Sequence, residues 1–115
     1  MSEMAGKNGA TARVASFICG AALEALPPSA VPKAKKAIAD TFAAILSGAG
    51  SELSQPLLSY VTAMQASGEH PLLGTGVSAV PETAALVNGA FGHALDYDDV
   101  LSMMPAHPSA VILAA

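Results

Sequence analysis

Residues 81–95 of this chain, PETAALVNGAFGHAL, decide its fold class. A proline at the start and a run of small and apolar side chains predict a helix over the whole stretch. Ala85, Gly89 and Gly92 repeat at three- and four-residue spacing, although an interior glycine costs up to about 1 kcal/mol relative to alanine. Two explanations stay open for these glycines: another backbone approaches this face closely, or the helix breaks locally.

Helical patterns also precede this stretch. Apolar residues recur at helical spacing in three earlier segments, over about residues 10–26, 29–47 and 54–68. Pro27 and Pro28 should stop the first helix, and Gly48 stands where a left-handed cap would end the second. Residues 70–76 read as a turn-rich connector with one short extended stretch. We therefore expect an all-α fold, the N-terminal part of a multi-helix domain with about four to five helices.

The composition limits the class of protein. Hydrophobic residues make up 52% of the chain and charged residues only 12%, against about 25% in a typical globular domain. Such a chain either lies in a membrane or has an apolar face that other polypeptide covers. The longest charge-free stretches, Leu53–Gly68 and Val100–Ala115, are shorter than the roughly 20 apolar residues of a spanning helix, and both contain proline and serine. We therefore expect no membrane association.

Charge and cysteine content exclude further classes. All five basic residues lie within the first 36 positions, so nucleic-acid binding, which needs clustered cations, is not expected. The N-terminus lacks the pattern of a secretory signal. The single cysteine, Cys19, excludes an internal disulfide and fits a reducing, cytoplasmic location. It lies in an apolar helical pattern, so we expect it to be buried and inert.

Chemistry-bearing residues concentrate between positions 93 and 109. The stretch contains His93, three carboxylates within four positions (Asp96, Asp98 and Asp99), and then His107-Pro-Ser109 before an apolar helix. Clustered carboxylates repel one another, which costs stability unless something uses or satisfies them. On a helix, His93 and Asp96 would share a face. These features favour a functional site over an ordinary loop.

His107 precedes the new helix, where free backbone amides attract anions, and a neutral imidazole there is a good proton-transfer group. The alternatives are structural: His107 could cap the helix, and His93 could be a satisfied buried histidine. The histidines and aspartates could also bind a divalent ion, but their order matches no calcium-loop, zincin or deaminase motif. We therefore predict no metal site.

The whole stretch resembles the MmgE/PrpD family. The matching residues are Asn88-Gly89, then His93-Ala-Leu-Asp96-Tyr-Asp98-Asp99, then His107-Pro-Ser109. Upstream, residues 34–48 resemble an early family helix, and residues 73–76 and 81–89 resemble the approach to the site. The family includes 2-methylcitrate dehydratase, cis-aconitate decarboxylase and iminodisuccinate epimerase. The resemblance covers about residue 10 to the end, whereas residues 1–9 are expected to be a flexible tail.

The resemblance implies a homodimeric enzyme, several times longer, with an all-helical domain and a smaller lid domain. It also implies that the enzyme needs neither a metal nor an organic cofactor. Residues 10–115 would be the N-terminal portion of the helical domain, with the lid absent. The implied reaction removes a proton next to a carboxylate of a small di- or tricarboxylic acid, leading to dehydration, decarboxylation or epimerisation. His107 and Asp96 would be catalytic, whereas His93, Asp98, Asp99 and Ser109 would contact substrate.

Two departures and two alternatives accompany this reading. Val100 stands where many family members have threonine, and no histidine or tryptophan follows it as in the decarboxylase branch. The family's catalytic lysine, second histidine and tyrosine would lie beyond residue 115, so we expect the isolated chain to be inactive. The alternatives are a non-catalytic helical module for dimerisation or scaffolding, and a metal-binding helical protein.

Overall fold

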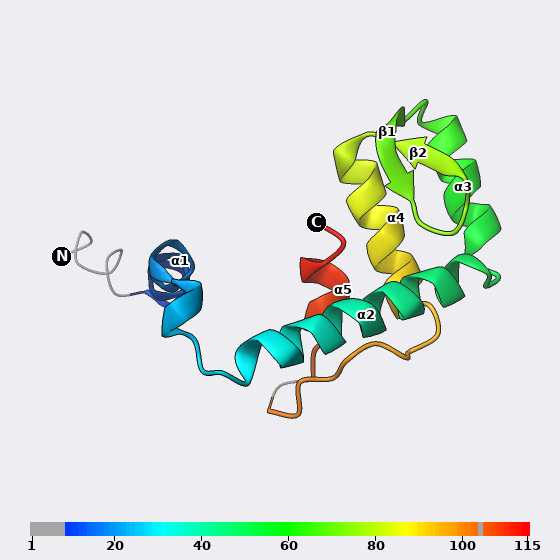
Figure 1. The fold of residues 1–115 in the computed structure, drawn as a ribbon. Helices are drawn as coiled ribbons and strands as arrows, with labels where there is room; N and C mark the ends of the chain where they lie inside the picture. The colour runs from blue at the N-terminus through cyan, green and yellow to red at the C-terminus, as the bar shows by residue number, and fades with distance from the viewer. Residues whose placement is uncertain (1–8, 104) are drawn as a thin grey trace. The chain divides into compact units, whose positions relative to one another are not determined.

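The computed structural model describes residues 9–103 and 105–115, so the tail expected over residues 1–9 lies outside this part except for Gly9. The chain divides into two compact units, Met1–Pro32 and Lys33–Ala115. The described residues form five α-helices, one 3-10 turn and a two-stranded antiparallel sheet (Figure 1). The all-α class with a short extended connector is therefore confirmed.

The first unit contains helix α1 (Ala10–Gly20) and a 3-10 turn, Leu23–Ala25. The helix predicted to reach residue 26 ends at Gly20, because glycine is a poor helix former and Ala21 is already extended. No residue of α1 is buried, and Cys19 is exposed, so the prediction of a buried thiol was wrong. Within the described residues, no helix is long and apolar enough to cross a membrane.

The core of the second unit lies where helix α2 (Ala30–Ala49) crosses helix α4 (Pro81–His93). Ile45, Val87 and Phe91 are completely buried there. Gly48 was predicted to cap α2, but the helix continues through it to Ala49. A Cβ at Gly48 would overlap the backbone carbonyl of Phe91, so glycine is required here for the close crossing of two helices.

Helix α3 (Ser54–Ala63) ends well before Gly68, where the sequence pattern had placed its end. Gln65 takes a left-handed conformation (φ 51°) and turns the chain into strand β1 (Ser67–Leu72). Gly68 lies in that strand, where a Cβ would overlap the backbone at Ala79 of the facing strand. The boundary was misplaced because a glycine needed for strand pairing was taken as a helix terminator.

Strand β1 pairs with β2 (Val77–Ala79), so the predicted connector is a hairpin. Asn88, which is buried on α4, fixes it in place. Its amide nitrogen donates to the Pro71 carbonyl (3.1 Å), and its carbonyl accepts from the Leu73 backbone N–H (3.0 Å). The hairpin is thereby attached to the helix that ends at His93.

Helix α5 (Pro108–Ile112) packs beside α4, and the glycines of α4 form the contact. A Cβ at Gly92 would lie 3.3 Å from Ile45 Cγ1 and 3.4 Å from Ala110 Cβ, and one at Gly89 would lie 3.5 Å from the Ala110 carbonyl. Helix α4 is continuous through both positions. Of the two explanations for these glycines, close approach by other elements is the one that the structure supports.

We predict that Gly48→Ala lowers the free energy of unfolding by about 1–3 kcal/mol, the usual cost of overpacking a core. The gain in helix propensity, up to about 1 kcal/mol, is too small to offset the overlap with the Phe91 carbonyl. Gly20→Ala is the matched control, because a Cβ there meets nothing within 4 Å. Urea denaturation followed by circular dichroism measures both; equal stability of the two variants would contradict the proposed crossing.

Candidate active site

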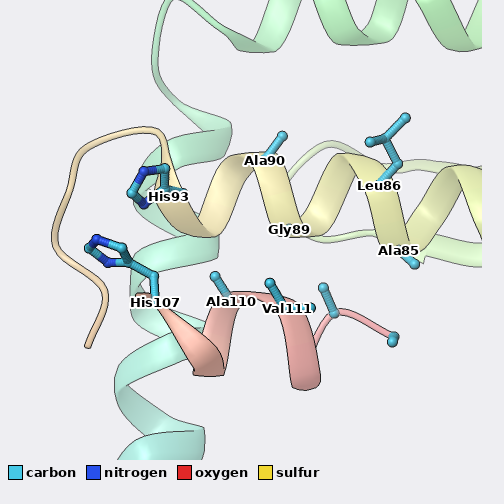
Figure 2. Close-up of a pocket in the computed structure, with 10 residues that line it drawn as sticks. Ala85, Leu86, Gly89, Ala90, His93, His107, Ala110 and Val111 are labelled. Atoms are coloured by element: carbon cyan, nitrogen blue, oxygen red, sulfur yellow. The ribbon is translucent and has the colours of Figure 1, made fainter. Parts of the chain in front are cut away.

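The two histidines of the motif lie at the same end of two neighbouring helices. His93 is the last residue of α4, and His107 immediately precedes α5. The loop between them turns back on itself, and the Leu101 N–H donates to the Ala106 carbonyl (3.0 Å). Figure 2 shows both imidazoles at this end, one from each helix. Their ring centroids are 4.4 Å apart and the planes are tilted by 60°.

Asp96 does not lie on helix α4, so the prediction that it shares a helix face with His93 was wrong. The helix ends at His93, and Asp96 takes a left-handed conformation (φ 55°), which aspartate tolerates better than most residues. Its N–H donates to the His93 carbonyl (3.1 Å). This turn leaves the Asp96 side chain 80% exposed, with Oδ1 3.9 Å from His107 Nε2.

His93 pairs with Asp98 instead of Asp96. The Asp98 side chain has no exposed surface, and its two oxygens lie 3.1 and 3.2 Å from His93 Nδ1. The same Oδ1 lies 3.3 Å from Nδ1 of His107. A buried carboxylate therefore stands between two imidazoles. When His93 Nδ1 carries the proton and donates to Asp98, its Nε2 keeps a free lone pair.

The two histidines differ in burial and in hydrogen bonding. The His93 side chain is 55% exposed, whereas that of His107 is 28% exposed. Nδ1 of His107 is itself buried and has no hydrogen-bond partner among the described residues. It lies within ion-pair distance of Asp98 Oδ1, but the two atoms are not aligned for a hydrogen bond. His107 is thus held less firmly than His93.

Asp99 holds the start of α5. Its Oδ1 accepts from the Ser109 N–H (3.1 Å), and its Oδ2 accepts from the Ser109 hydroxyl (2.7 Å). A carboxylate that accepts from the first free amides of a helix stabilises that end. His107 itself makes no side-chain capping bond. Asp99 therefore fixes the helix that carries His107, a role that the sequence pattern did not reveal.

The six site residues predicted from the sequence form two groups in the structure. His93, Asp96, Asp98 and His107 come together, and one potential ligand atom from each lies within 4.8 Å of the others. Asp99 and Ser109 pair with each other beside them. The catalytic roles of His107 and Asp96 stay predictions, as does substrate contact by the other four residues. Asp98, Asp99 and Ser109 already have hydrogen-bond partners within the chain.

An apolar groove extends from the histidines along α4 and α5, with a volume of about 600 Å³. Figure 2 shows His93 and His107 at one end of it. The rest of the lining is small or aliphatic: Ala85, Leu86, Gly89, Ala90, Ala110, Val111, Ala114 and Ala115. The sequence predicted an apolar face in general terms but did not locate this groove.

Comparison with known proteins identifies the family. The sequence matches the MmgE/PrpD N-terminal domain over residues 12–115. This chain belongs to the MmgE/PrpD family. The resemblance seen in residues 88–109 is thereby confirmed, and the family is of the lyase type as judged from the relatives' names.

Two curated relatives of the MmgE/PrpD family are similar to this chain. Both are named cis-aconitate decarboxylase, one from Aspergillus terreus strain NIH 2624 / FGSC A1156 and one from Aspergillus terreus. Each is 28% identical over 109 residues, which cover 95% of this chain but 22% of the relative. The chain thus spans about a fifth of the length of these relatives. No solved structure matches the chain.

We predict that Asp99→Ala destabilises α5 by about 0.5–2 kcal/mol, the usual cost of losing a helix cap. Both of its hydrogen bonds to Ser109 would be lost. Amide hydrogen exchange at residues 109–112 should accelerate, whereas exchange in α2 should not change. Asp40→Ala, which removes an exposed carboxylate on α2, is the control. Unchanged exchange in the Asp99 variant would show that the cap contributes nothing.

Proposed function

We propose that this chain supplies the histidine and aspartate part of an active site that removes a proton next to a carboxylate of a small polycarboxylic acid. His107 is the proton-transfer group, and Asp96, the exposed carboxylate 3.9 Å from its Nε2, assists it. His93, whose ring lies beside that of His107, contacts the substrate. Asp98 positions the imidazoles through its contact with Nδ1, and Asp99 holds the start of the helix that His107 precedes.

The observation that carries the proposal is the convergence of two imidazoles on one buried carboxylate. A carboxylate bonded to Nδ1, as Asp98 is to His93, fixes the tautomer and the orientation of that imidazole. The same carboxylate lies 3.3 Å from Nδ1 of His107, where its negative charge would stabilise the imidazolium that forms when Nε2 accepts a proton. Both histidines line the end of an open groove, where a small molecule can reach them. Neither a structural cap nor a satisfied core histidine requires such a pair.

Proton removal next to a carboxylate also requires positive charge to stabilise the anion that develops. The sequence has no lysine or arginine after Lys36, whereas seven acidic residues follow it. We therefore propose that the cationic groups come from polypeptide other than these 115 residues. The relatives, of which the chain spans 22%, have ample further length to supply them.

The relatives' name suggests the first substrate to test. Both are called cis-aconitate decarboxylase, and cis-aconitate is an unsaturated tricarboxylate of the proposed class. The sequence argues less for decarboxylation itself, because the residue directly after Val100 is leucine and not histidine or tryptophan. Dehydration and epimerisation therefore belong in the same substrate screen.

We predict that His107→Asn lowers kcat about 100- to 10,000-fold, the range expected when a general acid or base is removed. The assay uses the polypeptide encoded by the complete reading frame that contains this chain. It follows cis-aconitate, citrate and methylcitrate by proton nuclear magnetic resonance. The isolated 115-residue chain should show no turnover with any of them.

His70→Asn is the matched control, because His70 is exposed on β1 and does not belong to the cluster. It should keep the kcat of the unaltered enzyme. Equal activity of the His107 and His70 variants, both folded by circular dichroism, would refute the role assigned to His107. Sequencing past the Ala115 codon would show whether the required lysine follows in the same frame.

We also propose that the protein forms a homodimer through its helical part. Helix α2 carries Ile38, Phe42 and Leu46 at four-residue spacing, and the side chains of all three are exposed along one edge of the face that Ile45 buries. Such an apolar stripe on a helix is typical of an interface. A second copy of the chain can cover it with the same stripe, because two-fold contacts are self-complementary.

We predict that Phe42→Ser shifts the complete polypeptide from dimer toward monomer in sedimentation equilibrium by weakening association at least about tenfold, the effect of losing one well-buried aromatic side chain. Lys36→Ser changes an exposed residue on another side of α2 and should leave the association unchanged. A monomeric unaltered protein would overturn the dimer proposal without affecting the proposed chemistry.

A further inference from the structure

The cluster at the helix ends offers the donor atoms of a transition-metal site. His93 and His107 provide imidazole nitrogens, and Asp96 and Asp98 provide carboxylate oxygens. One such atom from each residue lies within 4.8 Å of the other three. The residues come from the end of α4, the following loop and the position before α5, so the fold rather than local sequence brings them together.

The separations of these atoms fit a shared ion. Zinc bonds to histidine nitrogen and carboxylate oxygen are about 2.0–2.2 Å long, which places neighbouring ligands of a tetrahedron roughly 3.3–3.6 Å apart. Asp98 Oδ1 lies 3.1 Å from Nδ1 of His93 and 3.3 Å from Nδ1 of His107. Two of the three separations among these atoms are therefore close to those expected around one shared ion.

An independent observation points to a ligand at the same place. Nδ1 of His107 is buried and has no hydrogen-bond partner among the described residues, although Asp98 Oδ1 is only 3.3 Å away. Buried polar atoms normally have a partner, so an unpaired one requires an explanation. A cation between this nitrogen and the carboxylate would satisfy both atoms at once, through the lone pair of the neutral imidazole.

The charge of the surroundings favours a cation. Asp96 and Asp98 bring two formal negative charges, and the sequence has no lysine or arginine after Lys36 to neutralise them. Two imidazole ligands select first-row transition ions over magnesium or calcium, which prefer oxygen ligands alone. Zinc, cobalt and manganese accept a mixed set of nitrogen and oxygen ligands.

We propose that His93, Asp96, Asp98 and His107 form a binding site for one divalent first-row transition ion, of which zinc is the best fit. The bound ion occupies the nitrogen of His107 that faces Asp98. If the proposed function holds, the ion also inhibits the enzyme, because an ion on Nδ1 of His107 leaves the proton on Nε2 and prevents Nε2 from accepting one from the substrate.

The test is a titration of the metal-free, untagged full chain with Co²⁺ and Zn²⁺. Isothermal calorimetry should give one ion per chain, and Co²⁺ should develop a visible ligand-field band that Zn²⁺ displaces. The melting temperature should rise with Zn²⁺ concentration, because an ion that binds only the folded state stabilises it. Mg²⁺ at the same concentration should produce neither effect.

Variants connect the binding to the cluster. Asp98→Asn and His107→Gln should each weaken Co²⁺ binding at least about tenfold, whereas His70→Gln, the remaining histidine of the chain, should not. His93→Gln is the safeguard against a folding defect, because its side chain is half-exposed, and it should weaken binding in the same way.

Absence of a Co²⁺ band, or equal weakening by His70→Gln, would overturn the metal proposal. The readout contains no substrate, so it is independent of the proposed reaction. Loss of turnover in His107→Asn without any Co²⁺ binding would retain the proton-transfer role and remove the metal. If the protein binds Co²⁺ but its His107→Asn variant keeps full turnover, the metal site stands and the proton-transfer role of His107 is refuted.

Discussion

The close crossing of α2 and α4 is the contact on which the rest of the second unit depends. It exists because Gly48 has no side chain, which lets the Phe91 carbonyl approach the α2 backbone. Phe91 and Ile45 are then fully buried against each other's helices. Since His93 follows Phe91 by two residues, the crossing also fixes where the first imidazole of the cluster stands. A structural glycine on one helix thereby sets the position of a chemical group on another.

The same logic explains which parts of the fold could be predicted from the sequence. Helix α4 was found because a proline start and a helical spacing of small residues are local signals, and its glycines correctly indicated close approach. Gly48 and Gly68 were misassigned because a glycine that ends a helix and a glycine that admits a neighbouring backbone look identical in sequence. Only the partner, Phe91 in one case and Ala79 in the other, distinguishes them. In the case of Gly48, the partner Phe91 is distant along the chain.

The candidate site shows a similar division. The sequence predicted that these residues belong to one site, and His93, Asp96, Asp98 and His107 do come together. The pairing within the site was not predicted, because the helical rule that couples His93 to a residue three positions later fails when the helix ends at His93. The left-handed turn at Asp96 then exposes that carboxylate and buries Asp98 instead. A single backbone conformation thus decides which aspartate faces solvent and which orients the histidines.

Charge balance connects the two proposals for this site. The cluster contains two carboxylates and two imidazoles. A third carboxylate, that of Asp99, lies beside the cluster and accepts a hydrogen bond from Ser109. When the imidazoles are neutral the site is anionic, and a polycarboxylate would be repelled from it. Substrate binding therefore requires added positive charge, either from basic side chains of other polypeptide or from protonation of the histidines. A divalent ion meets the same electrostatic need by another route, but when it binds Nδ1 of His107 it leaves the imidazole proton on Nε2, so that Nε2 can no longer accept a proton. The geometry that makes the cluster suitable for acid–base chemistry is, for that reason, also what makes it attractive to a transition metal.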